Sequence, residues 1–232
     1  MDIIAIITAR GGSKRIPQKN IKEFCGKPII AYSIEAALNS GIFNEVMVST
    51  DSGEIARIAE SYGASVPFLR SETASSDYAT TADVLLEVIS NYEAQGKYFG
   101  LICCIYPTAP FITPEKLQNA LDILYATKAD SLMPVVQFSF PPQRAVVIKD
   151  SKLKYQYPEF SSVRSQDLEN IYHDCGQFYF CYTSALQKYK TVITPDTATI
   201  IMPEEEVQDI DNISDWHIAE LKYKIFILKD GE

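Results

Sequence analysis

The chain has 232 residues, 47% of them hydrophobic, which fits one α/β domain with a sizeable core and excludes a disordered chain. A net charge of −9 argues against a general nucleic-acid surface, and no apolar stretch is long enough to span a membrane. The five cysteines lack metal-binding spacing and the start of the chain does not read as a signal peptide, so we expect a cytoplasmic protein.

Strand-like and helical patterns alternate along the chain, which predicts a mostly parallel mixed sheet with helices on both faces. Gly41 and Gly63 are expected to end the first two helices, and Pro114 to begin the fourth. The predicted strands are 3–8, 45–49, 65–69, 101–105, 131–137, 177–182 and 200–202, and the predicted helices are 28–40, 50–62, 81–92, 113–126 and 215–227.

The alternation breaks over residues 138–172, which are rich in Pro, Gln, Tyr and charged side chains. We interpret this stretch as an arm or hairpin inserted into a single domain that spans residues 1–232. We find no repeat, linker or low-complexity segment that would divide the chain further.

A glycine-rich, cation-rich loop from Ala9 to Asn20 directly follows the first strand. Gly11 and Gly12 can present backbone N–H groups to a ligand, and four cations within ten residues suit the phosphates of a nucleotide. The spacing is neither a P-loop nor G-x-G-x-x-G, and a plain strand-to-helix turn with incidental lysines is the alternative. The cations of this loop are Arg10, Lys14, Arg15 and Lys19.

Two further segments are candidates for the same site. Asp209 and Asp211 lie two residues apart, so in an extended segment both carboxylates point to one side and could hold one Mg²⁺. The alternative is a solvent-facing acidic turn capped by Asp211 or Ser214. The turn from Tyr106 to Phe111 follows a buried strand, which is where ligands lie in open α/β sheets, although a plain loop is equally compatible.

The arm and the segment after it contain polar side chains of less specific meaning. Arg144 and Arg164 could each bind a carboxylate through the planar guanidinium, or be ordinary surface residues. His173 and Asp174 are adjacent, so in a strand they point apart and a catalytic relay is not expected. We expect His173 to shape a substrate pocket or to be structural.

Together these motifs resemble the cytidylyltransferases that activate nine-carbon acidic sugars, the sialic acid type. The resemblance covers nearly the whole chain and includes Ser49-Thr50-Asp51, Leu69-Arg70, Ser76-Asp77, Tyr106 to Pro110 and Gln208 to Asp211. It implies a Rossmann-like nucleotidyltransferase fold, a homodimer, and an arm that crosses to the partner subunit with Arg164 near the neighbouring active site. The implied substrates are CTP and the acidic sugar.

The resemblance also implies roles for individual residues. Lys19 and Asn20 would stabilise the α-phosphate, Arg10 and Lys14 the departing pyrophosphate, and Asp209 and Asp211 would bind Mg²⁺. Arg70 and Thr81 would contact cytosine, and the nucleotide site would include Ala9, Gly11, Gly12, Ser13 and Asp77. The sugar would be bound by Tyr106, Gln143, Arg144, Arg164, Gln166, His173, Asp174 and Gln177.

Two departures from the sialic acid pattern bear on the sugar. Tyr106 replaces a glutamine and Ile112 replaces an arginine, and we expect both changes to lie on the sugar side. The stretches 164–169 and 172–179 are more similar to the branch that uses pseudaminic acid, a sugar of bacterial surfaces and flagellin. N-acetylneuraminic and legionaminic acid remain open alternatives, as do a sugar-1-phosphate nucleotidylyltransferase, a nucleotide-sugar glycosyltransferase and an inactive nucleotide-binding regulator.

Overall fold

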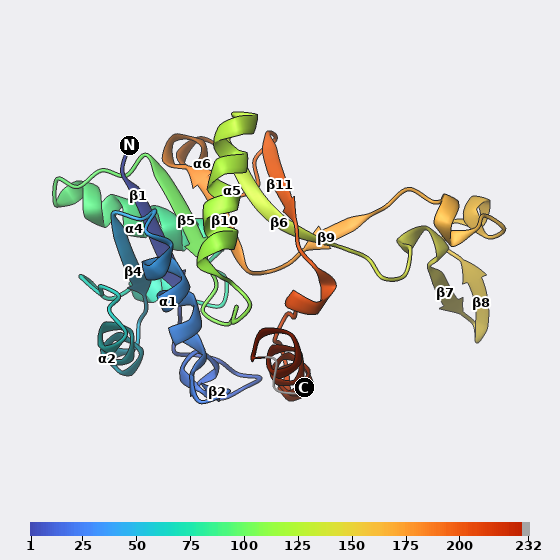
Figure 1. The fold of residues 1–232 in the computed structure, drawn as a ribbon, viewed down its shortest axis with the longest axis horizontal. Coiled ribbons are helices and arrows are strands. Elements are labelled where there is room, and N and C mark those ends of the chain that lie inside the picture. Colours follow the sequence, from blue (N-terminus) through green and yellow to red (C-terminus); the bar gives the residue numbers. More distant parts are fainter. Residues whose placement is uncertain (229–232) are drawn as a thin grey trace.

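The first apolar run forms strand β1 (Ile3–Thr8), which lies between β4 (Glu45–Ser49) and β5 (Leu101–Ile105) in a seven-stranded sheet. Figure 1 shows this computed structural model, which describes residues 1–228. The sheet order is β11-β6-β10-β5-β1-β4, and β9 pairs with β6 beyond the end of β10. The remaining strands are β6 (Ser131–Gln137), β9 (Tyr172–Asp174), β10 (Phe178–Tyr182) and β11 (Thr197–Ile201).

The sheet is mixed because β9 and β10 run against the other strands. β1 pairs in parallel with β4 and β5, and β11 pairs in parallel with β6, whereas β10 is antiparallel to both β5 and β6. β9 is also antiparallel to β6. The expected mixed, mostly parallel sheet is therefore confirmed.

Helices cover both faces of the sheet, and alternate side chains of β1 reach the two layers (Figure 1). Ile3, Ala5 and Ile7 pack with α1, α2 and α5, while Ile4 and Ile6 pack with α4 and α6. A continuous apolar strand is what burial on both faces requires. The helices are α1 (Ile29–Ser40), α2 (Gly53–Ser61), α3 (Glu72–Ser75), α4 (Thr81–Ala94), α5 (Pro114–Thr127), α6 (Thr183–Tyr189) and α7 (Ile213–Lys222).

A third, smaller apolar cluster joins the segment 16–32 to the last α-helix, α7. The hairpin of β2 (Glu23–Phe24) and β3 (Lys27–Pro28) places Phe24 edge-on against Trp216 of α7, with ring centroids 5.5 Å apart. Tyr223, at the start of the π-helix Tyr223–Leu228, packs on the same Phe24 ring. This cluster fixes the segment before α7 beside the cation-rich loop.

The arm projects away from the sheet as a continuation of β6 and β9 (Figure 1). Its tip is the antiparallel hairpin of β7 (Val146–Lys149) and β8 (Lys152–Tyr155), which leaves Ile148 77% and Leu153 63% exposed. Short 3-10 helices complete it at Pro142–Arg144, Pro158–Phe160 and Ser165–Asp167. Two further 3-10 helices outside the arm span Lys19–Ile21 and Glu204–Glu206.

Most predicted elements are confirmed, and the exceptions have local causes. The predicted strand 65–69 is wrong, because only Ser65 pairs with Met47 and Pro67 lacks the N–H that a continuing ladder needs. The last helix begins at Ile213 and is capped by Asn212, not by Asp211 or Ser214. Within residues 1–228, no helix has the length and apolar character needed to cross a bilayer.

Candidate active site

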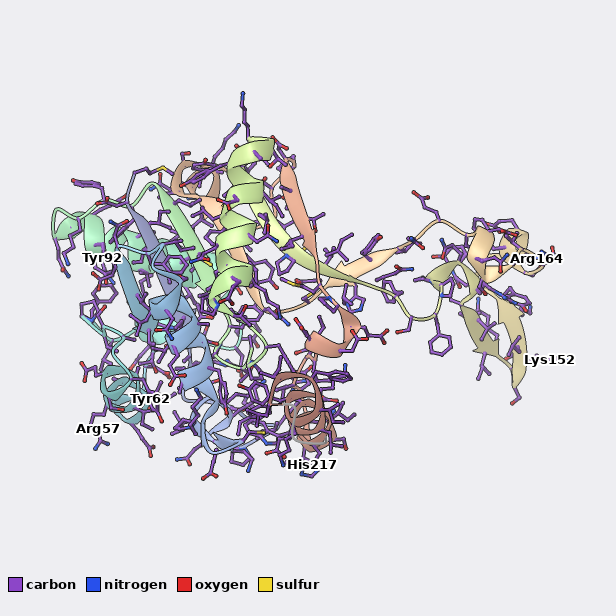
Figure 2. All side chains as sticks on the ribbon, viewed as in Figure 1. Arg57, Tyr62, Tyr92, Lys152, Arg164 and His217 are labelled. Carbon is purple, nitrogen blue, oxygen red and sulfur yellow. The ribbon has the colours of Figure 1, made fainter. Side chains whose placement is uncertain are left out.

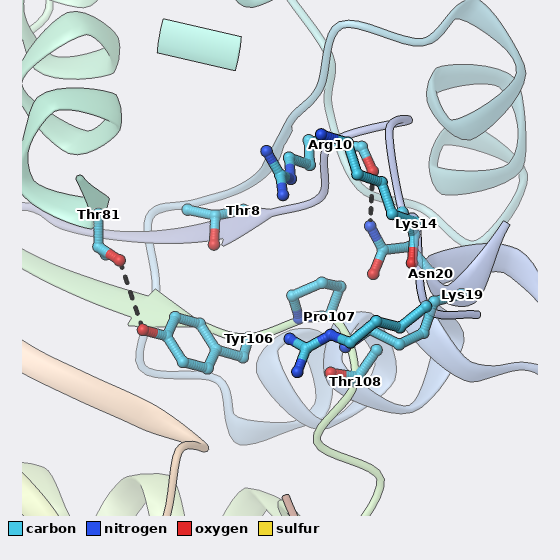
Figure 3. A pocket seen from close by; sticks show the side chains of 11 residues that line it. Thr8, Arg10, Lys14, Lys19, Asn20, Thr81, Tyr106, Pro107 and Thr108 are labelled. Atoms are coloured by element: carbon cyan, nitrogen blue, oxygen red, sulfur yellow. Dashed lines mark hydrogen bonds between the residues drawn. The ribbon is translucent and has the colours of Figure 1, made fainter. Parts of the chain in front are cut away.

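A cavity of about 410 Å³ lies where β1 and β5 end at their carboxyl ends, the usual place for a ligand in an open α/β sheet. Figure 3 shows that its walls come from the loop after β1, the turn after β5 and the start of α4. Seven of the expected site residues line it together with four others. The lining residues are Thr8, Arg10, Ser13, Lys14, Arg15, Lys19, Asn20, Thr81, Tyr106, Pro107 and Thr108.

Asn20 and Asp51 shape the cation-rich loop from inside. Asn20 is almost fully buried and its Nδ2 donates to the Arg10 carbonyl over 2.8 Å, which ties the two ends of the loop together (Figure 3). The Gly11 N–H donates to Asp51 Oδ1 over 2.7 Å. We expected this N–H to face a ligand, but in the structure it binds the protein's own carboxylate. A Cβ on Gly11 would meet Ser52 Cβ at 3.2 Å, so a glycine fits the close approach to α2.

Arg10 and Lys14 are paired with Asp77, which sits in the loop between α3 and α4. Arg10 Nη1 lies 2.9 Å from Asp77 Oδ1, and Lys14 Nζ lies 2.6 Å from Asp77 Oδ2. Hydrogen bonds from Lys14 and then Arg10 lower the pKa of Asp77, so the carboxylate is ionised at neutral pH. A carboxylate here occupies cations that would otherwise be available to a phosphate, and a part for Asp77 in the nucleotide site stays a prediction.

A second cavity of about 230 Å³ adjoins the first and shares Thr8, Arg10 and Thr81 with it. Arg70 lines this second cavity and is itself buried, with Nη2 donating to the Ser49 carbonyl over 2.6 Å. Burial lowers the pKa of Arg70, although nearby Asp51 partly opposes that effect. Arg70 and Thr81, the residues expected at the cytosine ring, are thus together next to the cations. Ala9 is fully buried and contributes backbone only, its N–H donating to the Ser49 carbonyl.

Asp209 and Asp211 flank Ile210, whose buried side chain packs in the third apolar cluster. Lys19 Nζ donates to the Ile210 carbonyl over 2.7 Å, and Arg15 Nη2 lies 2.7 Å from Asp211 Oδ1. Partial desolvation and then the charge of Asp211 raise the pKa of Asp209. Desolvation lowers the pKa of Lys19, against the pull of both carboxylates.

These two carboxylates have the oxygen donors that Mg²⁺ prefers, and they lie beside the cations of the cavity. In residues 1–228, no group of three or more His, Cys, Asp or Glu side chains is arranged to hold a metal ion. Mg²⁺ is commonly held by one or two carboxylates with water and substrate phosphates as its other ligands, so the pair fits such a role.

The turn after β5 forms the far wall of the cavity. Tyr106 N donates to the Gln177 carbonyl and its own carbonyl accepts from Ser33 Oγ, both over 2.8 Å, so the backbone is held from two sides. The Tyr106 hydroxyl faces Thr81 Oγ1 at 3.4 Å (Figure 3). Ile112, by contrast, is a core residue that is 5% exposed, so our expectation that it lies on the sugar side is wrong.

The other residues expected to bind the sugar do not line either cavity. Gln177 is buried and its Nε2 donates to the Glu206 carbonyl. Asp174 accepts hydrogen bonds from Tyr179 and from the Gly176 N–H, and the His173 ring packs on Phe138 at the base of the arm.

Four more of them lie on the arm, well away from the cavity. Gln143 Nε2 donates to the Glu169 carbonyl and Arg144 Nη1 to Ser165 Oγ, so both serve contacts within the arm. Figure 2 shows Arg164 at the far end of the arm, near Lys152. Gln166 lines a cavity of about 290 Å³ between the two sides of the arm. A single chain therefore does not bring these residues to the cation-rich cavity.

Several residues of the site were not assigned a role from the sequence. Thr8 lines the cavity because it ends β1, and the strand-end rule would have found it, whereas Pro107 and Thr108 lie in the turn after β5 that this rule had already marked. Asp51 and Tyr179 act through contacts made across the fold, with Gly11 and Asp174 respectively. No local sequence signal marks such long-range contacts.

Comparison with known proteins adds independent information. A family model described as cytidylyltransferase matches residues 4–193. A pseudaminic acid cytidylyltransferase of Campylobacter jejuni is 40% identical over 97% of each chain, and a CMP-N,N'-diacetyllegionaminic acid synthase of Legionella pneumophila is 35% identical over 95% of each. A solved CMP-2-keto-3-deoxy-manno-octonic acid synthetase in complex with CTP shares the fold, with a TM-score of 0.70, 17% identity, and coverage of 95% of this chain and 98% of its own.

Proposed function

Because the chain belongs to the cytidylyltransferase family, we propose that it activates pseudaminic acid with CTP, forming CMP-pseudaminic acid and pyrophosphate. The observation that carries this proposal is the cluster of cations at the carboxyl ends of β1 and β5. The relative of the same length from Campylobacter jejuni, named for pseudaminic acid, supports the choice of sugar.

In the proposed reaction the 2-hydroxyl oxygen of the sugar forms a bond to the α-phosphorus of CTP. The bond from that phosphorus to the oxygen bridging to the β-phosphate breaks, pyrophosphate leaves, and the hydroxyl proton is lost. Such chemistry needs positioning and charge stabilisation more than covalent help from the protein.

The cations of the loop would divide this task by position. Arg10 and Lys14 would exchange Asp77 for the β- and γ-phosphates, because they are the exposed end of the cluster. Lys19 lies deeper, beside Asp209 and Asp211, and would stabilise charge at the α-phosphate together with Asn20. Arg70 and Thr81 would hold the cytosine in the adjoining cavity.

Asp209 and Asp211 would hold Mg²⁺, whose charge, when bound, would neutralise the phosphate oxygens. Arg15 would have to release Asp211 for this to occur, since the two are now paired. Asp209 is also a candidate group to accept the sugar hydroxyl proton.

We further propose that a second copy of the chain completes the sugar side of the site. Gln143, Arg144, Arg164 and Gln166 are held on the arm and cannot reach their own cavity, and the arm exposes apolar side chains at its tip. A symmetric dimer would bury that apolar surface and bring the arm of one copy to the cavity of the other.

The proposed place of action is the cytoplasm. Cys103, Cys104, Cys175 and Cys181 are buried thiols, and burial raises the pKa of Cys104 to about 12. Buried thiols that are not oxidised to disulfides fit a reducing compartment. The product would serve the modification of bacterial surface structures or flagellin.

The test is pyrophosphate release with CTP, Mg²⁺ and three acids in parallel: pseudaminic, legionaminic and N-acetylneuraminic acid. Turnover confined to pseudaminic acid supports the full proposal. Turnover with legionaminic acid supports the second candidate, which the Legionella relative favours. A folded protein that binds CTP and turns over none of the acids would contradict the proposal and favour a glycosyltransferase or a regulator.

A further inference from the structure

A buried tyrosine outside the cavity supports the ring of Tyr106 from behind. Tyr179 of β10 is 3% exposed, and its ring meets the Tyr106 ring edge-on with centroids 5.5 Å apart. The Tyr179 hydroxyl donates to Asp174 Oδ2 over 2.7 Å, and Asp174 Oδ1 accepts from the Gly176 N–H over 2.8 Å. The Asp174 carboxylate therefore connects the Tyr179 hydroxyl to the turn at 175–177, between β9 and β10.

Tyr106 has its backbone fixed at both ends, which leaves the ring direction to be set by side-chain contacts. On one side its hydroxyl faces Thr81 (Figure 3). On the other side its ring packs edge-on against the ring of Tyr179. Thr81 lines both cavities, so Tyr106 stands at the boundary between the cations and the adjoining cavity.

We infer that Tyr179, held by Asp174, is a positioning residue that sets the direction of the Tyr106 ring and thereby the selectivity for the sugar acid. This inference rests on the proposed function. A hydrogen bond to a carboxylate is a strong one, and it holds the Tyr179 hydroxyl, and with it the position and tilt of the ring, in one place. A tilted Tyr106 ring would change the shape of the wall that the sugar meets, while the nucleotide cations stay in place.

The test substitutes Tyr179→Phe, which removes the hydroxyl and keeps the ring. We expect the KM for the sugar acid to rise roughly threefold to tenfold, the range of one ordinary hydrogen bond, because only part of the loss at Tyr179 reaches the Tyr106 ring. The KM for CTP should change less than the KM for the sugar acid. Of the residues expected to bind the nucleotide only Thr81 faces Tyr106, whereas the loop cations and Arg70 keep their own partners. The ratio of kcat/KM between the preferred acid and the other two acids should fall.

Tyr92→Phe is the matched control, because Tyr92 is also buried (1% exposed) but packs between Phe68 and Phe99 away from the site (Figure 2). It should leave the selectivity ratio unchanged. A merely structural role for Tyr179 would lower Tm and kcat without changing that ratio, and that result would overturn the inference.

A second background tests whether Tyr179 acts through Tyr106. In Tyr106→Ala, adding Tyr179→Phe should have no further effect on the selectivity ratio, because the ring that it positions is gone. An undiminished effect in that background would overturn the inference. Absence of turnover by the unsubstituted enzyme with every acid would instead contradict the proposed function, so the two failures are distinct.

Discussion

At the scale of single residues, the cations of the loop differ in how exposed their side chains are. We infer different roles for them from that difference. Lys14 and Arg10 have side chains 77% and 41% exposed and are paired to one carboxylate, so they can exchange it for another anion. Lys19 is more enclosed, donates to the Ile210 carbonyl and has a lowered pKa. The Lys19 ammonium group is thus held in one position before substrate binds. Such preorganisation is expected of a group that stabilises a transition state.

We therefore expect Lys19→Ala to lower kcat about a hundredfold, on the scale of removing one preorganised donor. The measurement is steady-state pyrophosphate release with saturating CTP and sugar. Lys224→Ala, an exposed lysine on the C-terminal π-helix, is the control that removes the same charge elsewhere. A loss below about threefold would place Lys19 outside contact with the reacting phosphate.

Asp211→Ala should abolish turnover while leaving the protein folded, because it removes half of the carboxylate pair and lies in a partly exposed position. Circular dichroism and Tm would check the fold, and Mg²⁺ titration the loss of metal dependence. Wild-type rates at saturating Mg²⁺ would show that Asp211 does not hold the metal.

At the scale of elements, sequence patterns predicted those whose ends carry strong local signals. Gly41 ends α1 and Pro114 begins α5, as the pattern predicted. The short helices α3 and α6 and the turn at 175–177 were not predicted, because contacts with residues distant in the sequence hold them in place. The same limit applies to the site: its loop was visible, whereas the bond from Gly11 to Asp51 was not.

Asp77, in the loop between α3 and α4, has two candidate roles, an internal anion that pairs with the loop cations or a nucleotide-binding group. The direction in which CTP affinity changes in a variant distinguishes them. If Asp77 acts as an internal anion, Asp77→Asn should bind CTP a few-fold more tightly, because Arg10 and Lys14 no longer have to be released. Calorimetric titration at two salt concentrations measures this, and the gain should shrink at high salt as exposed pairs are screened. Weaker binding would support the nucleotide-binding role that the sequence suggested for Asp77.

The aromatic cluster around α7 offers a test of support from a distance. Trp216 is 2% exposed and contacts Phe24, so Trp216→Ala should cost about 3 to 5 kcal/mol of unfolding free energy. Because Ile210 packs in the same cluster, Mg²⁺-dependent activity should fall even at temperatures where the variant remains folded. Full activity in the folded variant would show that the Asp209–Asp211 segment keeps its place without this packing.

At the scale of the whole molecule, the family and the reaction class were visible from the sequence, and the family is confirmed by the cytidylyltransferase match over residues 4–193. The stretch predicted to be an inserted arm has a hairpin of β7 and β8 at its tip, and its being an insertion stays a prediction. Its partner stays a prediction, because the contacts that an arm makes with another chain leave no periodic pattern in its own sequence.

Replacing 146–155 by a short Gly-Ser linker should give a folded monomer with little sugar turnover and unchanged CTP binding. Sedimentation gives the mass, and calorimetry the affinity for CTP. As a complement, an Arg10→Ala protein mixed with an Arg164→Ala protein should recover activity, since hybrid dimers contain one cavity with every residue intact. No recovery after subunit exchange would argue against a site shared between copies.

The path of the chain from the arm into the sheet has a mechanical consequence. Strand β9 leads out of the arm and ends at Asp174. Five residues further along the chain, Tyr179 of β10 packs against the Tyr106 ring. The arm therefore connects to the Tyr106 wall of the cavity through the turn at 175–177, where the Asp174 carboxylate accepts hydrogen bonds from the Gly176 N–H and the Tyr179 hydroxyl. A displacement of the arm would be passed through Asp174 to Tyr179, so we expect contacts at the tip of the arm to influence the wall of the cavity that Tyr106 forms.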